Sequence, residues 1–143
     1  MVVSLSRYRT GYRLEHRIER LYAQHGWLTT RYPKSGRRLY PADVLAVKRF
    51  EQKTVIHLVE CKNLSSNNSN DHLYIESNQI KKLKESAKEH NARALIAYSF
   101  PYQRPKILDA SNLKSSGKMY FVGRDDGISF SMFLKSFNKS RST

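Results

Sequence analysis

Two carboxylates and one ammonium group are spaced in this chain so that they share one face of a small β-sheet. Asp43 begins and Glu60 ends a segment that reads as a hairpin, and Lys62 follows Glu60 by two residues. Side chains alternate along a strand, so Glu60 and Lys62 point to the same side. If the hairpin turns symmetrically about residues 51 and 52, Asp43 lies opposite Glu60 and points there too. Such a group can hold a divalent metal ion and a water molecule.

The composition of both arms favours the hairpin. The arms, residues 43–50 and 54–60, are rich in β-branched and aromatic side chains, which suit a pleated strand, and the polar pair Glu51-Gln52 separates them. His57 falls on the face opposite the two carboxylates in this register. We therefore expect His57 to be packed rather than catalytic.

The chain carries a large positive charge. Its 26 Lys and Arg residues outweigh 12 Asp and Glu residues, which gives a formal charge of +14 and a pI near 10.1. An excess of this size attracts phosphate-rich ligands, and such binding weakens with salt because counterions are released. The sequence therefore predicts a nucleic acid partner, ahead of an anionic membrane or a small-molecule substrate.

The length, apolar runs and cysteine content exclude several classes of protein. No apolar run approaches the roughly 18 residues of a membrane span, and the apolar stretch at the N-terminus is too short for a signal peptide. We therefore expect an intracellular, cytoplasmic protein associated with the nucleoid. One cysteine, Cys61, can form neither an internal disulfide nor a zinc ribbon. A length of 143 residues fits a single domain, residues 1–143.

The hydrophobic pattern predicts the elements that must position these groups. A helix is expected over residues 10–25, with Leu14 and Ile18 at helical spacing and Gly26 as its stop, and a strand over 27–32. The further elements expected are a helix at 76–90, a buried strand at 94–100, a short strand at 119–122, and a final helix carrying Phe130, Phe133, Leu134 and Phe137.

Three segments are expected to be flexible: both ends, residues 1–8 and 138–143, and the Ser- and Asn-rich run 63–71. The order of the other elements predicts an α/β fold with a central mixed sheet flanked by helices.

The motifs resemble a known nuclease signature. Pro41-Ala42-Asp43 followed by Glu60-Cys61-Lys62 is similar to the PD-(D/E)xK pattern. About residues 10–137 resemble the archaeal Holliday-junction resolvases in three further features. These are Glu15 in the first helix, the loop Arg31-Tyr32-Pro33-Lys34-Ser35-Gly36, and Gln79 at the start of the second helix.

The chain departs from that family at two positions. His16 stands where those resolvases often carry Arg, and Ala42 separates Pro41 from Asp43. These changes leave the carboxylates intact, but they put the phosphate contacts near Glu15 in doubt.

The resemblance implies a homodimeric, magnesium-dependent endonuclease of the restriction-endonuclease-like fold, which introduces paired nicks into four-way DNA junctions during recombination and repair. Manganese is expected to substitute for magnesium. Asp43, Glu60 and Glu15 would be metal ligands, together with the backbone carbonyl of Cys61. Lys62 would orient the attacking water or help to deprotonate it.

The resemblance also implies contacts to the DNA. Ser35, on the basic loop, would contact the scissile phosphate and contribute to catalysis. The residues expected to bind the DNA backbone are Arg31, Lys34, Arg37, Arg38 and Gln79. Near the N-terminus, Tyr8, Arg9, Tyr12 and Arg13 would either stack on exposed bases or belong to a frayed arm.

Most of these assignments have a purely structural alternative. Asp43 would end a strand, and Glu60 with Lys62 would form an exposed ion pair of little energetic value. Ser35 would be a turn residue, Glu15 would pair with arginines on a solvated helix face, and Gln79 would be a surface residue at a helix start. The phenylalanines of the final helix would fill the core or form the dimer surface.

Two rival functions also stay open. One is a restriction-like or repair endonuclease of the same fold that acts on duplex DNA, because target choice depends on loops and dimer geometry. The other is a non-catalytic architectural protein that binds junctions. The intact set Asp43, Glu60 and Lys62 argues against the second, because a protein that only binds DNA gains nothing from two acids on its DNA-facing surface.

Overall fold

The computed structural model describes residues 14–32, 41–64 and 71–139. Its strands are β1 (Leu28–Arg31), β2 (Val44–Phe50), β3 (Lys53–Asn63), β4 (His72–Glu76), β5 (Arg93–Ser99), β6 (Lys106–Asp109), β7 (Lys114–Ser115), β8 (Met119–Gly123) and β9 (Ile128–Ser129). Its helical segments are the first helix, whose described residues are 14–24, then α2 (Ser77–Glu89), the short 3-10 turn η2 (Ala110–Asn112) and α3 (Phe130–Lys139).

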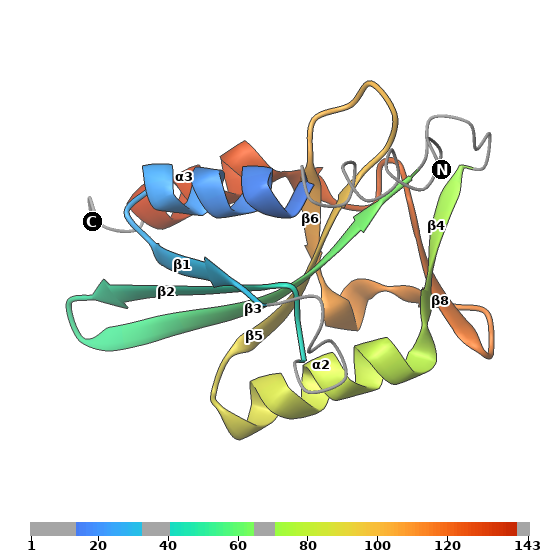
Figure 1. Cartoon of the computed structure of the whole chain (residues 1–143), viewed down its shortest axis with the longest axis horizontal. Helices are drawn as coiled ribbons and strands as arrows, with labels where there is room; N and C mark the ends of the chain where they lie inside the picture. The colour runs from blue at the N-terminus through green and yellow to red at the C-terminus, as the bar shows by residue number, and fades with distance from the viewer. Residues whose placement is uncertain (1–13, 33–40, 65–70, 140–143) are drawn as a thin grey trace.

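The central sheet has six strands in the order β1-β2-β3-β5-β6-β9. It is mixed, because β3 and β5 run parallel whereas the other neighbours are antiparallel. A second sheet of three strands has the order β4-β8-β7. Figure 1 shows the first helix and α3 on one side of the central sheet and α2 on the other. No helix among the described residues is long and apolar enough to cross a membrane.

The β2–β3 hairpin turns at residues 51–52, as predicted. The regular register ends where Val44 pairs with Val59. Asp43 directly precedes this pair, and its N–H donates to the Val59 carbonyl, so Asp43 lies beside the part of β3 that leads into Glu60.

The first helix and α3 cover one face of the central sheet. Val59 of β3 packs there with Ile18 and Tyr22 of the first helix and with Phe130 and Phe133 of α3, and all five are buried. The phenylalanines of the final helix therefore fill the core, and they do not supply an exposed dimer surface.

Helix α2 covers the opposite face. Leu58 of β3 packs there with Ile80 and Leu83. Neighbouring residues of β3 thus belong to opposite layers, as alternation along a strand requires. By the same alternation, Glu60 and Lys62 leave the strand on the α2 side.

The sequence pattern did not predict several of the short strands. β6 and β9 lie in segments that read as loops, β7 has two residues, and β4 runs directly into α2. The predicted flexible segments lie mostly outside the described residues. Two of their boundaries are wrong, because β3 includes Asn63 and α3 extends to Lys139.

His57 lies in the layer of the first helix and is packed, as predicted. It is fully buried. The Tyr22 hydroxyl lies 2.9 Å from its Nδ1, and the Trp27 ring centroid lies 4.6 Å from its own. Burial lowers the pKa of His57 to about 3, and the positive charge of Arg93 acts in the same direction.

We expect His57 to make stability depend on pH in the acidic range. Its pKa falls from 6.5 when unfolded to about 3 when folded, so below pH 6.5 only the unfolded chain takes up this proton. The free energy of unfolding should therefore fall by about 1.4 kcal/mol per pH unit from this group alone. Urea unfolding at neutral pH and at about pH 5 measures the loss.

The matched control is His57→Gln, which has no titrating group at this position. This variant should lose less stability than the wild type between the two pH values, even if it starts lower. Equal losses would show that His57 does not govern the acid sensitivity.

Candidate active site

Asp43 lies where β2 departs from β3. Its backbone is held between two strands, because its N–H donates to the Val59 carbonyl (3.0 Å) and its carbonyl accepts from the Tyr32 N–H (2.9 Å). Its side chain continues the pairing beyond β2, since Oδ2 accepts a hydrogen bond from the Cys61 N–H at 2.8 Å. The carboxylate thus has a fixed position beside the residue that follows Glu60.

Glu60 and Lys62 lie on β3, a strand paired on both sides. The Lys62 Nζ is 3.7 Å from the Glu60 Oε1. Glu60 is only 7% exposed, so the pair is not the solvated surface ion pair that the sequence also allowed. A carboxylate this deeply buried needs a nearby cation to offset its lost hydration, and Lys62 provides one.

The structure therefore brings together Asp43, Glu60 and Lys62. Asp43 directly precedes the pair of Val44 with Val59, and its carboxylate accepts a hydrogen bond from the Cys61 N–H, between Glu60 and Lys62. Among the described residues, only the Cys61 N–H donates to the Asp43 carboxylate, which leaves Oδ1 available to a ligand.

Gln79 lies in the first turn of α2, the helix that packs on the same face as Glu60. Its side-chain oxygen is buried and accepts no hydrogen bond from a described residue. A buried polar atom without a partner is uncommon in folded proteins and calls for an explanation. A bound water, ion or DNA group on this face would satisfy it.

Glu15 belongs to the opposite layer. It is only 6% exposed, and its helix neighbours Leu14 and Ile18 pack against the Val59 side of the sheet. The first helix thus covers the hairpin, but on the face away from Glu60. Within residues 14–32, 41–64 and 71–139, no three His, Cys, Asp or Glu side chains form a group that could hold a metal ion. Glu15 does not join the two hairpin carboxylates in such a group.

Arg31 ends β1 and faces the first helix, where its Nε lies 3.3 Å from the Glu19 Oε1. The other predicted contacts on the basic loop fall outside the described residues; these are Ser35, Lys34, Arg37 and Arg38. The same holds for Tyr8, Arg9, Tyr12 and Arg13.

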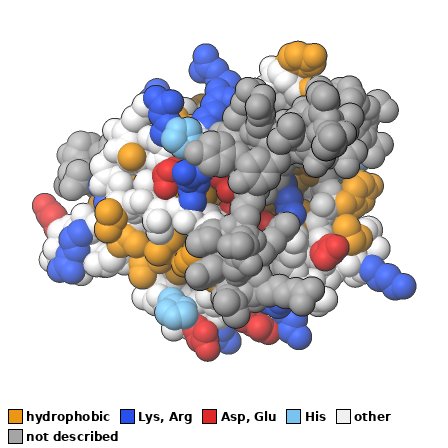
Figure 2. Space-filling view, viewed as in Figure 1, with side chains coloured by type: hydrophobic (Ala, Val, Ile, Leu, Met, Phe, Trp, Pro, Cys, Tyr) orange, Lys and Arg blue, Asp and Glu red, His pale blue; other side chains and the backbone are white. Residues whose placement is uncertain are grey.

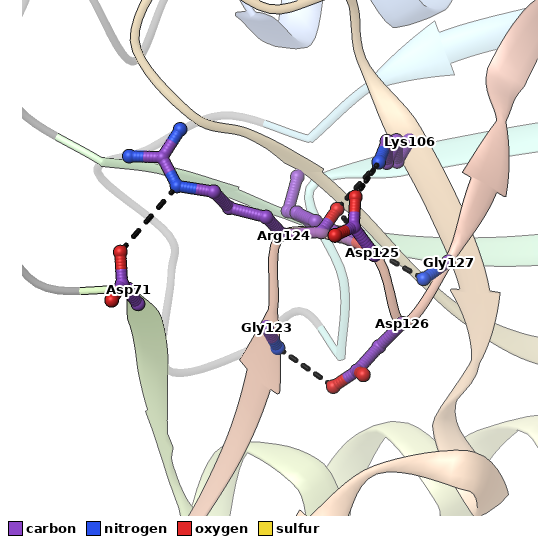
Figure 3. Close-up of polar contacts among 8 residues, drawn as sticks. Asp71, Lys106, Gly123, Arg124, Asp125, Asp126 and Gly127 are labelled. Carbon is purple, nitrogen blue, oxygen red and sulfur yellow. Dashed lines mark hydrogen bonds and ion pairs between the residues drawn. The ribbon is translucent and has the colours of Figure 1, made fainter.

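A polar network beside the site was missed in the sequence. Lys106 Nζ donates to the Arg124 carbonyl (2.6 Å) and lies 3.3 Å from the Asp125 Oδ1, while the Gly127 N–H donates to the Tyr98 hydroxyl (2.7 Å). Figure 3 shows how these bonds fasten the turn between β8 and β9. The residues of this network are far apart in the sequence. The only part of it that the local sequence indicated was the turn, through the run Asp125-Asp126-Gly127.

Positive charge lies at several places on one face of the molecule. On the face shown in Figure 2, Lys and Arg side chains occur at several separate places, with Asp and Glu between some of them. This distribution suits contact with a long or branched polyanion more than with one small anionic group.

The sequence matches the family described as archaeal Holliday junction resolvase (hjc) over residues 6–142. The chain belongs to this family. It is therefore a nuclease of the Holliday junction resolvase family, which agrees with the resemblance of its motifs. No curated protein matches the chain.

Two solved structures resemble this member of the resolvase family. Hjc, a Holliday junction resolvase of Archaeoglobus fulgidus, matches with a TM-score of 0.69 and 16% identity, covering 87% of this chain and 95% of that chain. This match confirms the predicted fold, a central mixed sheet flanked by helices. D212, a nuclease from a fusselovirus, matches with a TM-score of 0.48 and 13% identity, covering 94% of this chain and 93% of that chain.

The role of Asp43 in holding the strands predicts different effects for two substitutions. Asp43→Ala leaves the Cys61 N–H without its acceptor and should lower the free energy of unfolding by about 1–3 kcal/mol. Asp43→Asn keeps a carbonyl oxygen and should cost less than the alanine variant. Urea denaturation of the three proteins measures the order, and equal losses for Ala and Asn would contradict the structural role of this bond.

Proposed function

We propose that this chain resolves four-way DNA junctions as a metal-dependent endonuclease whose centre is Asp43, Glu60 and Lys62. The observation that carries the proposal is the meeting of two carboxylates and one ammonium group on the α2 face of β3, in a chain of the archaeal resolvase family. Glu60 and Lys62 lie on β3, and Asp43, which directly precedes β2, is held by backbone hydrogen bonds to Val59 and Tyr32. Their separation is therefore fixed before substrate arrives, as a catalytic centre requires.

The donor atoms fit a hard divalent cation. Asp43 and Glu60 supply carboxylate oxygens, and the Cys61 backbone carbonyl is the proposed third protein ligand. Oxygen ligands favour Mg²⁺, or Mn²⁺ in its place, over zinc or copper. When bound, the metal ion would stabilise charge on the attacked phosphate and lower the pKa of a bound water.

Lys62 has two roles in the proposed reaction. Its ammonium group orients the attacking water, and it donates to the phosphate oxygen on which negative charge develops. The water oxygen forms a bond to phosphorus, in line with the bond to the 3′ oxygen, which breaks. The leaving oxygen takes up a proton, so the products are a 5′-phosphate and a 3′-hydroxyl.

The remaining candidates act around this centre. Gln79, whose side-chain oxygen has no described partner, orients the attacking water or the DNA backbone from α2. Ser35 contacts the scissile phosphate, and the positive side chains proposed to hold the DNA backbone are Arg31, Lys34, Arg37 and Arg38.

We also propose that the active form is a homodimer. A four-way junction is resolved by two cuts in strands related by symmetry, so two equivalent centres related by a two-fold axis are needed. The core position of Phe130 and Phe133 means that the dimer surface uses other residues.

The decisive experiment compares a synthetic four-way junction with a linear duplex of the same sequence, in the presence of magnesium. Wild-type protein should introduce paired, symmetric nicks into the junction alone. Asp43→Asn and Glu60→Gln should not cut, but should bind the junction as tightly as the wild type or more tightly, because each removes a negative charge that repels DNA. Cleavage on sequencing gels and binding by mobility shift give the two readouts.

Three outcomes would contradict the proposal. Equal cutting of the duplex would indicate a general or restriction-like nuclease. Tight binding of both DNAs without cutting by the wild type would indicate an architectural protein. Full activity in the carboxylate variants, with folding intact, would move the centre elsewhere.

Lys62→Met tests the proposed role of the lysine in the centre. It removes the ammonium group but keeps much of the side-chain volume, so the cleavage rate at saturating junction should fall by about 100-fold or more. Junction affinity should change much less. The matched control is Lys114→Met, which also removes a lysine paired with a carboxylate (3.3 Å from the Asp126 Oδ1), but in the three-stranded sheet. Equal loss in both variants would indicate a general charge effect.

A further inference from the structure

A tyrosine occupies a turn position that normally requires glycine. After β5, the Gln103 N–H donates to the Phe100 carbonyl at 3.1 Å, which closes a four-residue turn. Pro101 is its second residue, and Tyr102, the third, has a φ of +62°. Proline followed by a positive φ defines a type II turn, in which glycine or asparagine is usual at the third position. Tyr102 therefore holds a strained backbone conformation.

Packing does not explain this choice of residue. The side chain of Tyr102 is fully exposed, with a relative exposure of 101%, so its ring gains nothing from the core. A glycine at this position would be less strained and would leave the same core. A strained residue whose side chain is wholly in solvent is a candidate for contact with a ligand.

The turn that carries Tyr102 is firmly held. The Ser99 hydroxyl lies 3.3 Å from the Phe100 carbonyl and 3.2 Å from the Gln103 carbonyl. Phe100 is buried, and the Arg124 guanidinium lies 4.9 Å from its ring centroid. The Tyr102 ring is thus presented from a fixed base, which lowers the entropy lost when it binds.

This turn lies at the end of the sheet that carries the proposed centre. β3 and β5 are parallel, Lys62 pairs with Tyr98, and Asn63 pairs with Ser99. The Leu64 N–H also donates to the Ser99 carbonyl at 3.0 Å. The turn begins one residue beyond this pairing. Figure 1 shows the loop between β5 and β6 projecting at the same end of the sheet as the end of β3.

Two arginines belong to this loop or contact its first residue, Phe100. Arg104 is exposed in the same loop. Arg124, which stacks on Phe100, extends towards Asp71 (Figure 3), with its Nε 3.7 Å from the Asp71 Oδ1. An exposed aromatic ring with arginines beside it is the combination that stacks on bases while contacting phosphates.

We propose that Tyr102 stacks on a base at the branch point of a four-way junction and thereby positions the scissile strand at Asp43, Glu60 and Lys62. This inference rests on the proposed function. In continuous duplex each base is covered by its neighbours, whereas a branch point that a protein holds open exposes the faces of its terminal base pairs. An exposed ring therefore finds a stacking partner in a junction and none inside a duplex. Tyr102 is a positioning residue that favours junctions over duplex.

Two variants separate this role from a structural one. Tyr102→Gly removes the ring and also relieves the strain, so it should raise Tm by roughly 3 °C while weakening junction binding about tenfold. Its affinity for linear duplex should not change. Tyr102→Phe keeps the ring and should bind both DNAs as the wild type does. Tyr74→Ala, which removes another exposed tyrosine (51% exposed) from β4, should leave the junction preference unchanged.

A fluorescent base gives a direct readout. In a synthetic junction with 2-aminopurine at the branch point, saturating wild type and Tyr102→Phe should change the emission, and saturating Tyr102→Gly should change it much less. Identical emission changes and affinities for wild type and Tyr102→Gly would overturn the inference while leaving the proposed function standing. A wild type that binds junction and duplex equally would overturn the proposed function and this inference with it. Loss of the dimer in Tyr102→Gly, seen by sedimentation, would make Tyr102 an interface residue and would also overturn it.

Discussion

The pairing of β3 on both sides is the constraint on which the rest of the structure depends. β3 is antiparallel to β2 and parallel to β5, so alternation along it assigns Val59 to one layer and Glu60 to the other. Where β2 departs, the Asp43 carboxylate takes over the hydrogen bond to the Cys61 N–H. The same interaction that ends one strand thus fixes an acidic group beside the next.

The charge of the candidate site is opposite in sign to the net charge of the chain. The protein carries a net charge of +14, which draws DNA in, yet its candidate centre places two carboxylates where a phosphate would have to approach. Glu60 is only 7% exposed, so bringing a phosphate near its carboxylate adds like-charge repulsion where little water is present to screen it. This local conflict is resolved if a divalent cation lies between the carboxylates and the phosphate, and the all-oxygen donor set is of the type that such a cation prefers.

The hairpin could be predicted because its determinants are local. The polar turn at residues 51–52 and the two-residue period of the strands bring Asp43 to the part of β3 that carries Glu60, and no distant contact is needed. The layer of Glu15 could not be predicted, because it depends on which face of the sheet the first helix covers. β6 and β9 were missed for the same reason: each is a short strand whose pairing partner lies elsewhere in the chain. The sequence did not indicate the strained backbone of Tyr102, because its positive φ follows from how Ser99 and Phe100 hold the turn.

Two departures from local rules lie on elements that adjoin the candidate centre. His57 departs from the rule that histidine is partly solvated, and its aromatic surroundings account for it within the core. Gln79 and Tyr102 have no such account: one has a buried oxygen without a described partner, and the other combines a strained backbone with an exposed ring. Gln79 is on the layer of Glu60, and Tyr102 follows the strand that pairs with Lys62. Two separate costs to stability thus lie on elements that adjoin the candidate centre, namely α2 and the turn after β5, and a bound substrate would offset them.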